Sequence, residues 1–195
     1  NILNLAKNTG VKRIFFSSSS EVYGEPVEFP QNEDTTPLNS KLPYAIVKNV
    51  AEAFLKSYKK EYDLDYTIFR FFNTYGPRQK TDFVMSRFVN LALKNEDITI
   101  YGDGKQTRTF CYIDDNIETT CSAFLKDKYI NDVLNVGNDN EVSILDLAKE
   151  IIKVTGSRSK ILNGPPLKEG DMTRRKPDIS KMKILLNRDL VSLKE

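Results

Sequence analysis

The 195-residue chain contains no histidine at all. This absence excludes Ser-His-Asp and Cys-His nucleophiles, histidine general bases and most catalytic zinc sites. Acid–base chemistry must therefore come from Tyr, Lys, Asp or Glu side chains, and we predict no metal site.

Cysteines and long apolar runs are also scarce. Cys111 and Cys121 do not make a disulfide framework, and no secretion signal precedes them. No apolar run approaches the ~20 residues of a membrane span. The net charge of +2 comes from interspersed acids and bases, without the basic stripe that nucleic-acid binding requires. We therefore expect a reduced, cytoplasmic protein that has neither a membrane nor a nucleic acid as a partner.

The sequence also lacks a glycine-rich phosphate loop. Its nine glycines form neither G-x-G-x-x-G, nor G-x-x-G-x-x-G, nor G-x-x-x-x-G-K-[ST]. The chain opens at Asn1, without an initiator methionine, inside what reads as a helix. If the protein uses a nucleotide cofactor, we expect the usual phosphate-binding turn to lie outside this sequence.

The order of the elements predicts an α/β fold. An amphipathic helix over 1–9, a buried strand over 11–16, a helix over 44–62 and a second buried strand over 66–72 follow one another. This order is typical of a parallel, doubly wound sheet. Further helices and strands are expected later in the chain: helices at 83–93, 114–126 with Asp114 as N-cap, 143–154 with Ser143 as N-cap, and a short one ending at Leu186; strands at 98–101, 110–113 and 133–136.

Tyr44 and Lys48 stand four residues apart near the start of the predicted helix 44–62. That spacing places the phenol and the ammonium on one helix face. A phenol is a poor base at neutral pH because its reference pKa is about 10, and a neighbouring cation favours the phenolate. Such a pair can remove a proton from a sugar hydroxyl. A chain with nine tyrosines supplies roughly one such spacing by chance. The neighbouring sequence segments must therefore decide whether this pair is catalytic.

Polar segments follow both buried strands. Residues 17–24 are rich in serine, and Asn73 comes directly after the second strand. Open α/β sheets bind ligands at the carboxyl ends of their strands. The serine-rich segment fits such a ligand site and fits an ordinary polar loop equally well.

Four segments in this order resemble the extended short-chain dehydrogenase/reductase family, specifically its NAD-dependent nucleotide-sugar epimerases, dehydratases and decarboxylases. They are Ser18-Ser19-Ser20-Glu21-Val22-Tyr23-Gly24, Tyr44-x-x-x-Lys48, Arg70-Phe71-Phe72-Asn73-Thr74-Tyr75-Gly76-Pro77 and Gly104-x-x-x-Arg108-x-x-x-Tyr112-Ile113-x-Asp115. The resemblance spans residues 1 to about 186.

The resemblance implies a partial doubly wound (Rossmann-like) parallel sheet plus a small C-terminal α/β substrate-binding lobe. Residues 1–78 with 109–137 would form the C-terminal part of the dinucleotide-binding domain, and 79–108 with 138–195 the lobe. The first strands, the glycine-rich turn and the acidic residue for the adenosine ribose are absent. We therefore expect the chain to be truncated at its N-terminus.

The resemblance also implies a role for each site residue. Tyr44 would take the proton of the sugar 4-hydroxyl while a hydride leaves for NAD, Lys48 would bond the nicotinamide ribose, and Ser19 would bond the same sugar oxygen. Further residues are assigned to the cofactor (Ser17, Phe71, with Tyr44 and Lys48) and to the substrate (Asn73, Arg87, Arg108, Arg174, Arg175). The substrate would be a UDP- or dTDP-linked sugar. The arginines would clamp its diphosphate or, alternatively, be solvated surface charges.

Ser20 and Glu21 bear on the reaction that follows the shared 4-keto sugar. The dehydratases of the family carry Asp where this chain has Ser20, and simple 4-epimerases need no acid at position 21. The UDP-glucuronate decarboxylases share the hydroxyl-Ser-Glu triplet and an Arg-Lys-Pro run like residues 175–177, in which Arg175 would assist protonation.

We therefore predict an NAD-dependent nucleotide-sugar epimerase/dehydratase, with UDP-glucuronate decarboxylase as the alternative. A non-catalytic remnant that keeps a nucleotide-sugar pocket or a dimer surface is the alternative from another class. The helix 44–62 carries apolar residues on more than one side, so we expect it to be buried on two faces and to form a homodimer.

Overall fold

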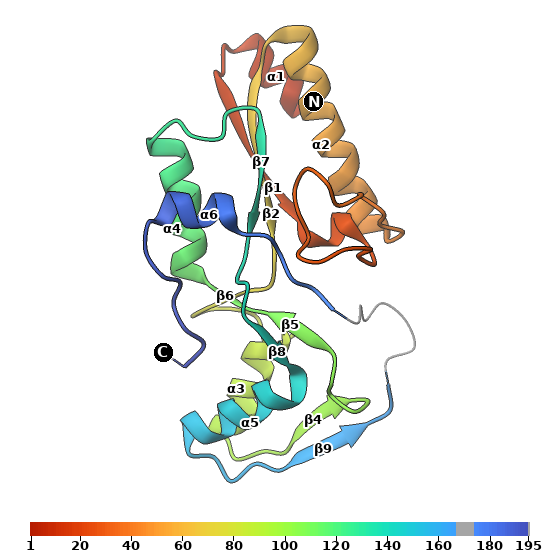
Figure 1. The fold of residues 1–195 in the computed structure, drawn as a ribbon, viewed down its shortest axis with the longest axis vertical. Coiled ribbons are helices and arrows are strands. Elements are labelled where there is room, and N and C mark those ends of the chain that lie inside the picture. Colours follow the sequence, from red (N-terminus) through yellow and green to blue (C-terminus); the bar gives the residue numbers. More distant parts are fainter. Residues whose placement is uncertain (167–173, 195) are drawn as a thin grey trace.

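Three parallel strands form the centre of the upper part of the molecule in Figure 1. The structure, a computed structural model, describes residues 1–166 and 174–194. The strands are β1 (Arg13–Ser19), β2 (Asp65–Phe71) and β7 (Asp132–Val136), in the order β1-β2-β7. In the register, Phe16 lies beside Ile68, and Ile68 beside Val133. Runs of apolar residues of this kind are expected of strands that are covered on both faces.

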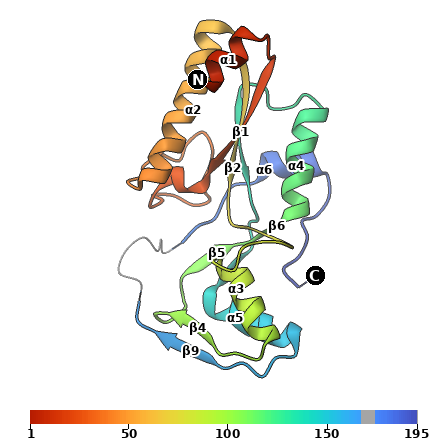
Figure 2. The same cartoon turned by 180° about the vertical axis from the view of Figure 1, so that it is seen from behind.

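Helices cover both faces of this sheet, as Figures 1 and 2 show from opposite sides. One face carries α1 (Ile2–Asn8) and α2 (Pro43–Tyr62), and the other carries α4 (Ile113–Leu125) and α6 (Ser180–Leu186). Successive residues of β2 pack on opposite faces: Ile68 contributes to the core under α2, and Phe69 to the core under α4 and α6. The prediction of a doubly wound parallel sheet is confirmed.

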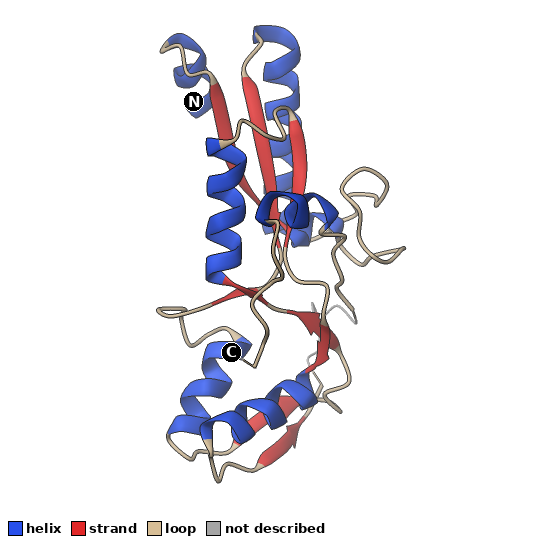
Figure 3. Cartoon of the chain, turned by 60° about the vertical axis from the view of Figure 1, so that its left-hand side comes forward, coloured by secondary structure: helices blue, strands red, loops and turns tan. Residues whose placement is uncertain are grey.

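A smaller α/β region forms the lower part of the molecule (Figure 3). Its strands are paired two by two: β3 (Thr74–Tyr75) with β6 (Cys111–Tyr112), β4 (Ile98–Tyr101) with β9 (Ile161–Gly164), and β5 (Thr107–Thr109) with β8 (Glu141–Ser143). Helices α3 (Val84–Leu93) and α5 (Ile144–Thr155) pack around a core that includes Phe88, Ile98 and Leu147. The exact division of the chain into two domains remains a prediction.

Most helix boundaries agree with those predicted from the sequence, whereas one predicted N-cap does not. The Ser143 Oγ accepts a hydrogen bond from the Asp146 N–H at 3.0 Å, so the predicted cap of α5 is correct. Asp114 was the wrong cap for α4, because β6 runs directly into the helix and Tyr112 occupies the N-cap position.

The outer side of α2 is exposed rather than buried within this chain. Ala45, Glu52 and Leu55 are buried against the sheet, but Val47 is 67% exposed and Phe54 is 54% exposed. The expected burial of a second face by a partner subunit therefore stays a prediction. Among the described residues, none of the helices has the length and apolar character that crossing a bilayer requires.

Candidate active site

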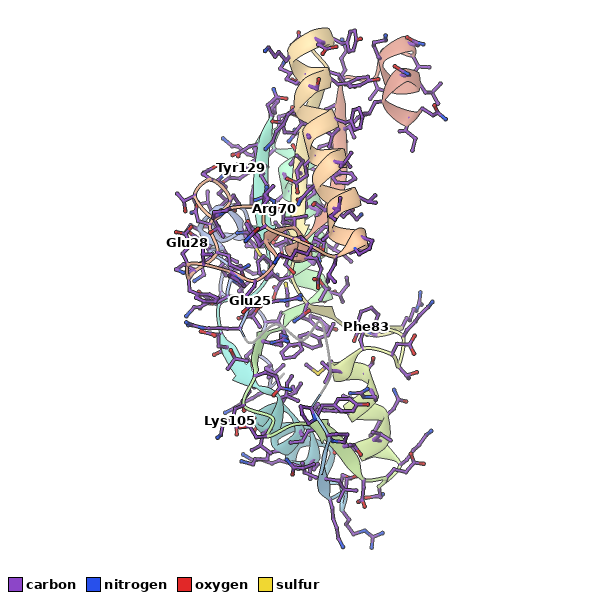
Figure 4. All side chains as sticks on the ribbon, turned by 90° about the vertical axis from the view of Figure 1, so that its right-hand side faces the viewer. Glu25, Glu28, Arg70, Phe83, Lys105 and Tyr129 are labelled. Carbon is purple, nitrogen blue, oxygen red and sulfur yellow. The ribbon has the colours of Figure 1, made fainter. Side chains whose placement is uncertain are left out.

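A cleft of about 900 Å³ lies where the carboxyl ends of β1 and β2 meet the lower region. Its walls come from the end of β1, the 3-10 turn Ser20–Tyr23, the start of α2, the end of β2, α3, β4 and β5. Most predicted site residues line it: Ser19, Ser20, Glu21, Tyr44, Phe71, Asn73, Arg87, Arg108 and Arg175. Figure 4 labels Arg70 beside α2 in the upper part, and Phe83, which also lines the cleft, next to α3.

Tyr44 lies in the first turn of α2, where its side chain reaches the cleft. The residue is 58% exposed. Lys48 donates from Nζ to the backbone oxygen of Ser17 at 2.7 Å, and the same Nζ lies 5.7 Å from the centroid of the Tyr44 ring. The ammonium is therefore fixed at the carboxyl end of β1, beside the phenol. Ser17 and Lys48 are not among the residues that line the cleft.

The end of β1 and the turn after it supply hydroxyl and carboxyl groups to the cleft. The Ser19 Oγ accepts a hydrogen bond from the Glu21 N–H at 3.2 Å, and Ser20 is buried. Glu21 Oε1 pairs with Arg175 Nη2 at 2.7 Å. Glu21 Oε2 is buried without a hydrogen-bond partner among the described residues. Leaving a buried carboxylate oxygen without a hydrogen-bond partner costs free energy.

Three arginines give the cleft a positive character. Arg87, Arg108 and Arg175 reach it from α3, β5 and the segment before α6. The Arg87 guanidinium lies 5.7 Å from the ring centroid of Tyr101. Arg108 is buried and donates to the backbone oxygen of Thr107 at 2.7 Å. Guanidinium groups arranged in this way suit a phosphate or carboxylate ligand.

Arg174 does not reach the cleft, unlike its neighbour Arg175. It forms a fork with Glu141, from Nε to Oε1 and from Nη2 to Oε2, each at 2.7 Å. These bonds hold the pKa of Glu141 at about 2. The guanidinium also lies 4.4 Å from the ring centroid of Phe29. The structure therefore places Arg174 in a contact between the 25–42 loop and β8.

Several residues that line the cleft were not predicted. They include Gln79, Asp82, Tyr101 and Gln106. None of these four residues belongs to the four recognised segments, apart from Gln106, which occupies an unspecified position in the last of them. Gln79, Asp82 and Gln106 lie in segments with the sequence signals of turns. Tyr101 ends the strand that was predicted at 98–101. Only the packing of the lower region against the sheet brings these residues to the cleft.

The residues that would hold the nicotinamide end of NAD are present and accessible. Tyr44, Lys48 and the backbone oxygen of Ser17 lie together at the carboxyl end of β1. Among the described residues, β1 pairs only with β2, so its other edge is open. This arrangement fits one half of the cofactor, whereas the glycine-rich turn for the other half is not in this sequence.

Comparison with known proteins agrees with this geometry. The model of the "NAD dependent epimerase/dehydratase family" matches residues 1–137. The chain belongs to this family. The resemblance seen in the sequence is thereby confirmed.

Curated members of the family resemble the chain along nearly all of its length. It is 39% identical over 196 residues to the UDP-N-acetyl-alpha-D-glucosaminuronate decarboxylase of Bacillus cytotoxicus, covering 94% of this chain and 60% of that protein. It is also 39% identical to UDP-glucuronic acid decarboxylase 1 of Danio rerio, covering 95% of this chain and 45% of that protein. The chain thus spans about half the length of the curated relatives that it matches.

Solved structures of the same family have closely similar folds. The UDP-glucose 4-epimerase of Thermotoga maritima, crystallised with UDP-glucose, gives a TM-score of 0.91 at 34% identity, covering 99% of this chain and 63% of that one. The UDP-glucuronic acid 4-epimerase of Bacillus cereus, in complex with NAD, gives a TM-score of 0.86 at 33% identity, covering 99% of this chain and 61% of that one.

Proposed function

We propose that the full-length protein is an NAD-dependent nucleotide-sugar enzyme of the epimerase/dehydratase type, which acts through a 4-keto sugar. The observation that carries this proposal is the single cleft that holds Tyr44, Ser19, the Glu21–Arg175 pair and further arginines. A phenol beside a fixed ammonium can act as a base, and cationic walls can bind a diphosphate. The relatives with bound UDP-glucose and bound NAD support the same assignment.

In this proposal, different residues of the chain carry out proton transfer and substrate binding. Tyr44 takes the proton of the sugar 4-hydroxyl, and Ser19 hydrogen-bonds to the same oxygen. Lys48 places its positive charge beside the Tyr44 ring. Asn73, Arg87 and Arg108 hold the nucleotide and its diphosphate, a task that suits guanidinium forks. NAD, when bound, supplies the acceptor for the two electrons that leave the sugar.

Decarboxylation is the second candidate for the step that follows oxidation. A 4-keto group lies β to a carboxylate on C5, so the C5–C6 bond can break, carbon dioxide leaves and the electron pair moves onto the C4 oxygen. A proton then returns to C5, and return of the hydride to C4 from the reduced NAD, when bound, would complete the turnover. The Glu21–Arg175 pair favours this candidate because it places a cation and a carboxylate together in the cleft. The two curated relatives described above are both decarboxylases by name.

Tyr44→Phe in the full-length protein tests the function. Purified protein is incubated with NAD and either UDP-glucose or UDP-glucuronate, and products are identified by NMR. We expect loss of the base to lower turnover by about 10²- to 10⁴-fold, with binding of UDP nearly unchanged. A new pentose product with release of carbon dioxide indicates the decarboxylase, and an inverted C4 centre the epimerase.

Tyr58→Phe is the matched control, since Tyr58 lies on the same helix and donates its hydroxyl hydrogen to Asn4 Oδ1 at 2.7 Å. This variant should keep wild-type turnover. Unchanged turnover in Tyr44→Phe would contradict the proposed mechanism. A wild-type protein that binds UDP but converts none of the sugars would instead be a non-catalytic remnant.

We also propose that a second copy of the chain covers the exposed side of α2. The exposed apolar residues Val47, Val50 and Phe54 follow one another at helical spacing. Ile2 and Leu5 of α1, which packs against α2, are exposed as well. A homodimer through α2 is therefore the partner that we assign, beside the nucleotide sugar.

A further inference from the structure

One side of α2 carries three functional groups at four-residue spacing: Tyr44, Lys48 and Glu52. Residues four apart lie on one side of a helix, one turn after another. Lys48 Nζ donates to the Ser17 backbone oxygen at 2.7 Å, and Glu52 Oε1 accepts from the Ser18 Oγ at 2.5 Å. The helix that carries Tyr44 is thus joined to two consecutive residues of β1.

Glu52 is a buried charge with a fixed partner. It is 1% exposed, as is Arg70 of β2. Arg70 donates from Nε to Oε1 at 3.1 Å and from Nη2 to Oε2 at 2.8 Å. A two-bond fork of this kind fixes the orientation of both groups. A buried ion pair contributes little net stability, because removing both charges from water offsets most of the attraction. Stability alone is therefore a poor explanation for this pair.

Apolar packing gives little rotational control to the first half of α2. Ala45 is the only buried hydrophobic residue among residues 43–54, all of which the structure describes, and the next one is Leu55. Directional hydrogen bonds must therefore set the rotation of this half. At the helix surface, ~5–6 Å from the axis, a rotation of about 10° moves a side chain by about 1 Å. A misplacement of about 1 Å can lower a rate by on the order of 10²-fold.

Hydrogen bonds also connect Arg70 with the turn that carries Glu21. Arg70 Nη1 donates to the Tyr23 hydroxyl oxygen at 2.9 Å, and Tyr23 donates to Asn135 Oδ1 at 2.7 Å. Burial raises the pKa of Tyr23 to about 12, so its hydroxyl keeps its hydrogen at neutral pH. Tyr23 ends the 3-10 turn that contains Glu21. The Glu52–Arg70 pair therefore connects α2 with this turn.

We infer that Glu52 is a positioning residue, which acts through Ser18 and Arg70 to hold α2 and the 3-10 turn so that Tyr44 and Glu21 face the same cleft. Glu52 does not line the cleft, so it acts without touching the substrate. This inference rests on the proposed function, because it assigns Tyr44 as the base.

The test compares Glu52→Gln with the wild type in the full-length protein. The amide keeps the shape but removes the charge that orients Arg70. We expect kcat to fall by about 10- to 100-fold, while KM for the nucleotide sugar stays within about twofold. Hydrogen exchange should become faster at the backbone amides of residues 46–50. Glu61→Gln, an exposed change on the same helix, is the matched control and should keep the wild-type kcat.

Two further variants separate positioning from stability. In Glu52→Leu with Arg70→Met, apolar side chains of similar size replace both charges. We expect this double variant to regain the wild-type melting temperature but not the wild-type kcat. Ser18→Ala removes only the link to β1, and we expect it to lower kcat by about three- to tenfold with unchanged KM.

Recovery of kcat together with stability in the double variant would overturn the inference, as would a wild-type kcat in Glu52→Gln or Ser18→Ala. If Glu52→Gln fails to fold, the double variant and Ser18→Ala still test whether Glu52 is a positioning residue. Failure of the proposed function is a different result, since the wild type itself would then show no turnover.

Discussion

At the scale of single residues, Gly24 shows how tightly the turn beside the cleft is built. Its backbone has φ 62° and ψ −147°, a region that residues with a side chain rarely adopt. A Cβ added there would lie 2.3 Å from the backbone oxygen of Asn39. The turn with Ser20 and Glu21 therefore depends on glycine at this position.

Gly24→Ala should lower the free energy of unfolding by more than about 3 kcal/mol, because backbone strain and a clash with backbone atoms add together. Gly10→Ala is the matched control. Gly10 also has a positive φ of 73°, but no atom lies within 4 Å of an added Cβ, so we expect a loss of only about 1 kcal/mol. Urea unfolding of the full-length variants measures both values. Equal losses would show that the contact with Asn39 is unimportant.

Most of the site residues that the sequence predicted line the cleft, and the failure of the prediction at Arg174 has a physical reason. Successive side chains of an extended segment point in opposite directions. Of the adjacent Arg174 and Arg175, only one could therefore enter the cleft. The sequence offers no means of choosing, because the choice depends on Glu21 and Glu141, which are far away in the chain.

At the scale of elements, the long helices and the buried strands were predictable because their apolar periodicity is local. The strands β3, β5, β8 and β9 were not predicted. Each has two to four residues, and each exists only through pairing with a distant segment, as Arg108 pairs with Val142 and Ile98 with Ile161. Non-local pairing of this kind leaves little signal in a short window of sequence.

The start of α4 supplies an element-scale prediction. Asp115 is fully buried, and it accepts hydrogen bonds from Arg188 Nη1 at 2.7 Å and from the Val191 N–H at 3.0 Å. This residue therefore fastens the segment after α6 to α4. Arg188→Ala leaves the buried carboxylate with one partner fewer, and we expect it to lower the free energy of unfolding by about 1.5–3 kcal/mol.

Urea unfolding of the full-length protein measures this loss. Lys183→Ala is the control, since Lys183 pairs with Asp139 at the exposed surface, and its removal should cost less than about 1 kcal/mol. A loss in Arg188→Ala that is no larger than in this control would contradict the assigned role of Asp115.

At the scale of the whole molecule, the outer edge of β1 has no strand partner among the described residues, and the outer side of α2 is exposed. The chain spans about half the length of its curated relatives. A parallel strand with an open edge is a site for further strands. The side of α2 is different, because a helix presents side chains and no unpaired backbone groups, so it suits a second folded surface.

Phe54→Glu in the full-length protein tests whether this surface forms the proposed homodimer. Phe54 is 54% exposed in the middle of α2, and a charge there would be buried without a partner on association. We expect the mass in solution, measured by light scattering or sedimentation, to change from dimer to monomer. Leu125→Glu is the matched control, because Leu125 at the end of α4 is 75% exposed on the opposite side of the sheet. If the dimer persists in Phe54→Glu but dissociates in Leu125→Glu, the interface lies at α4 and the proposed interface at α2 is wrong.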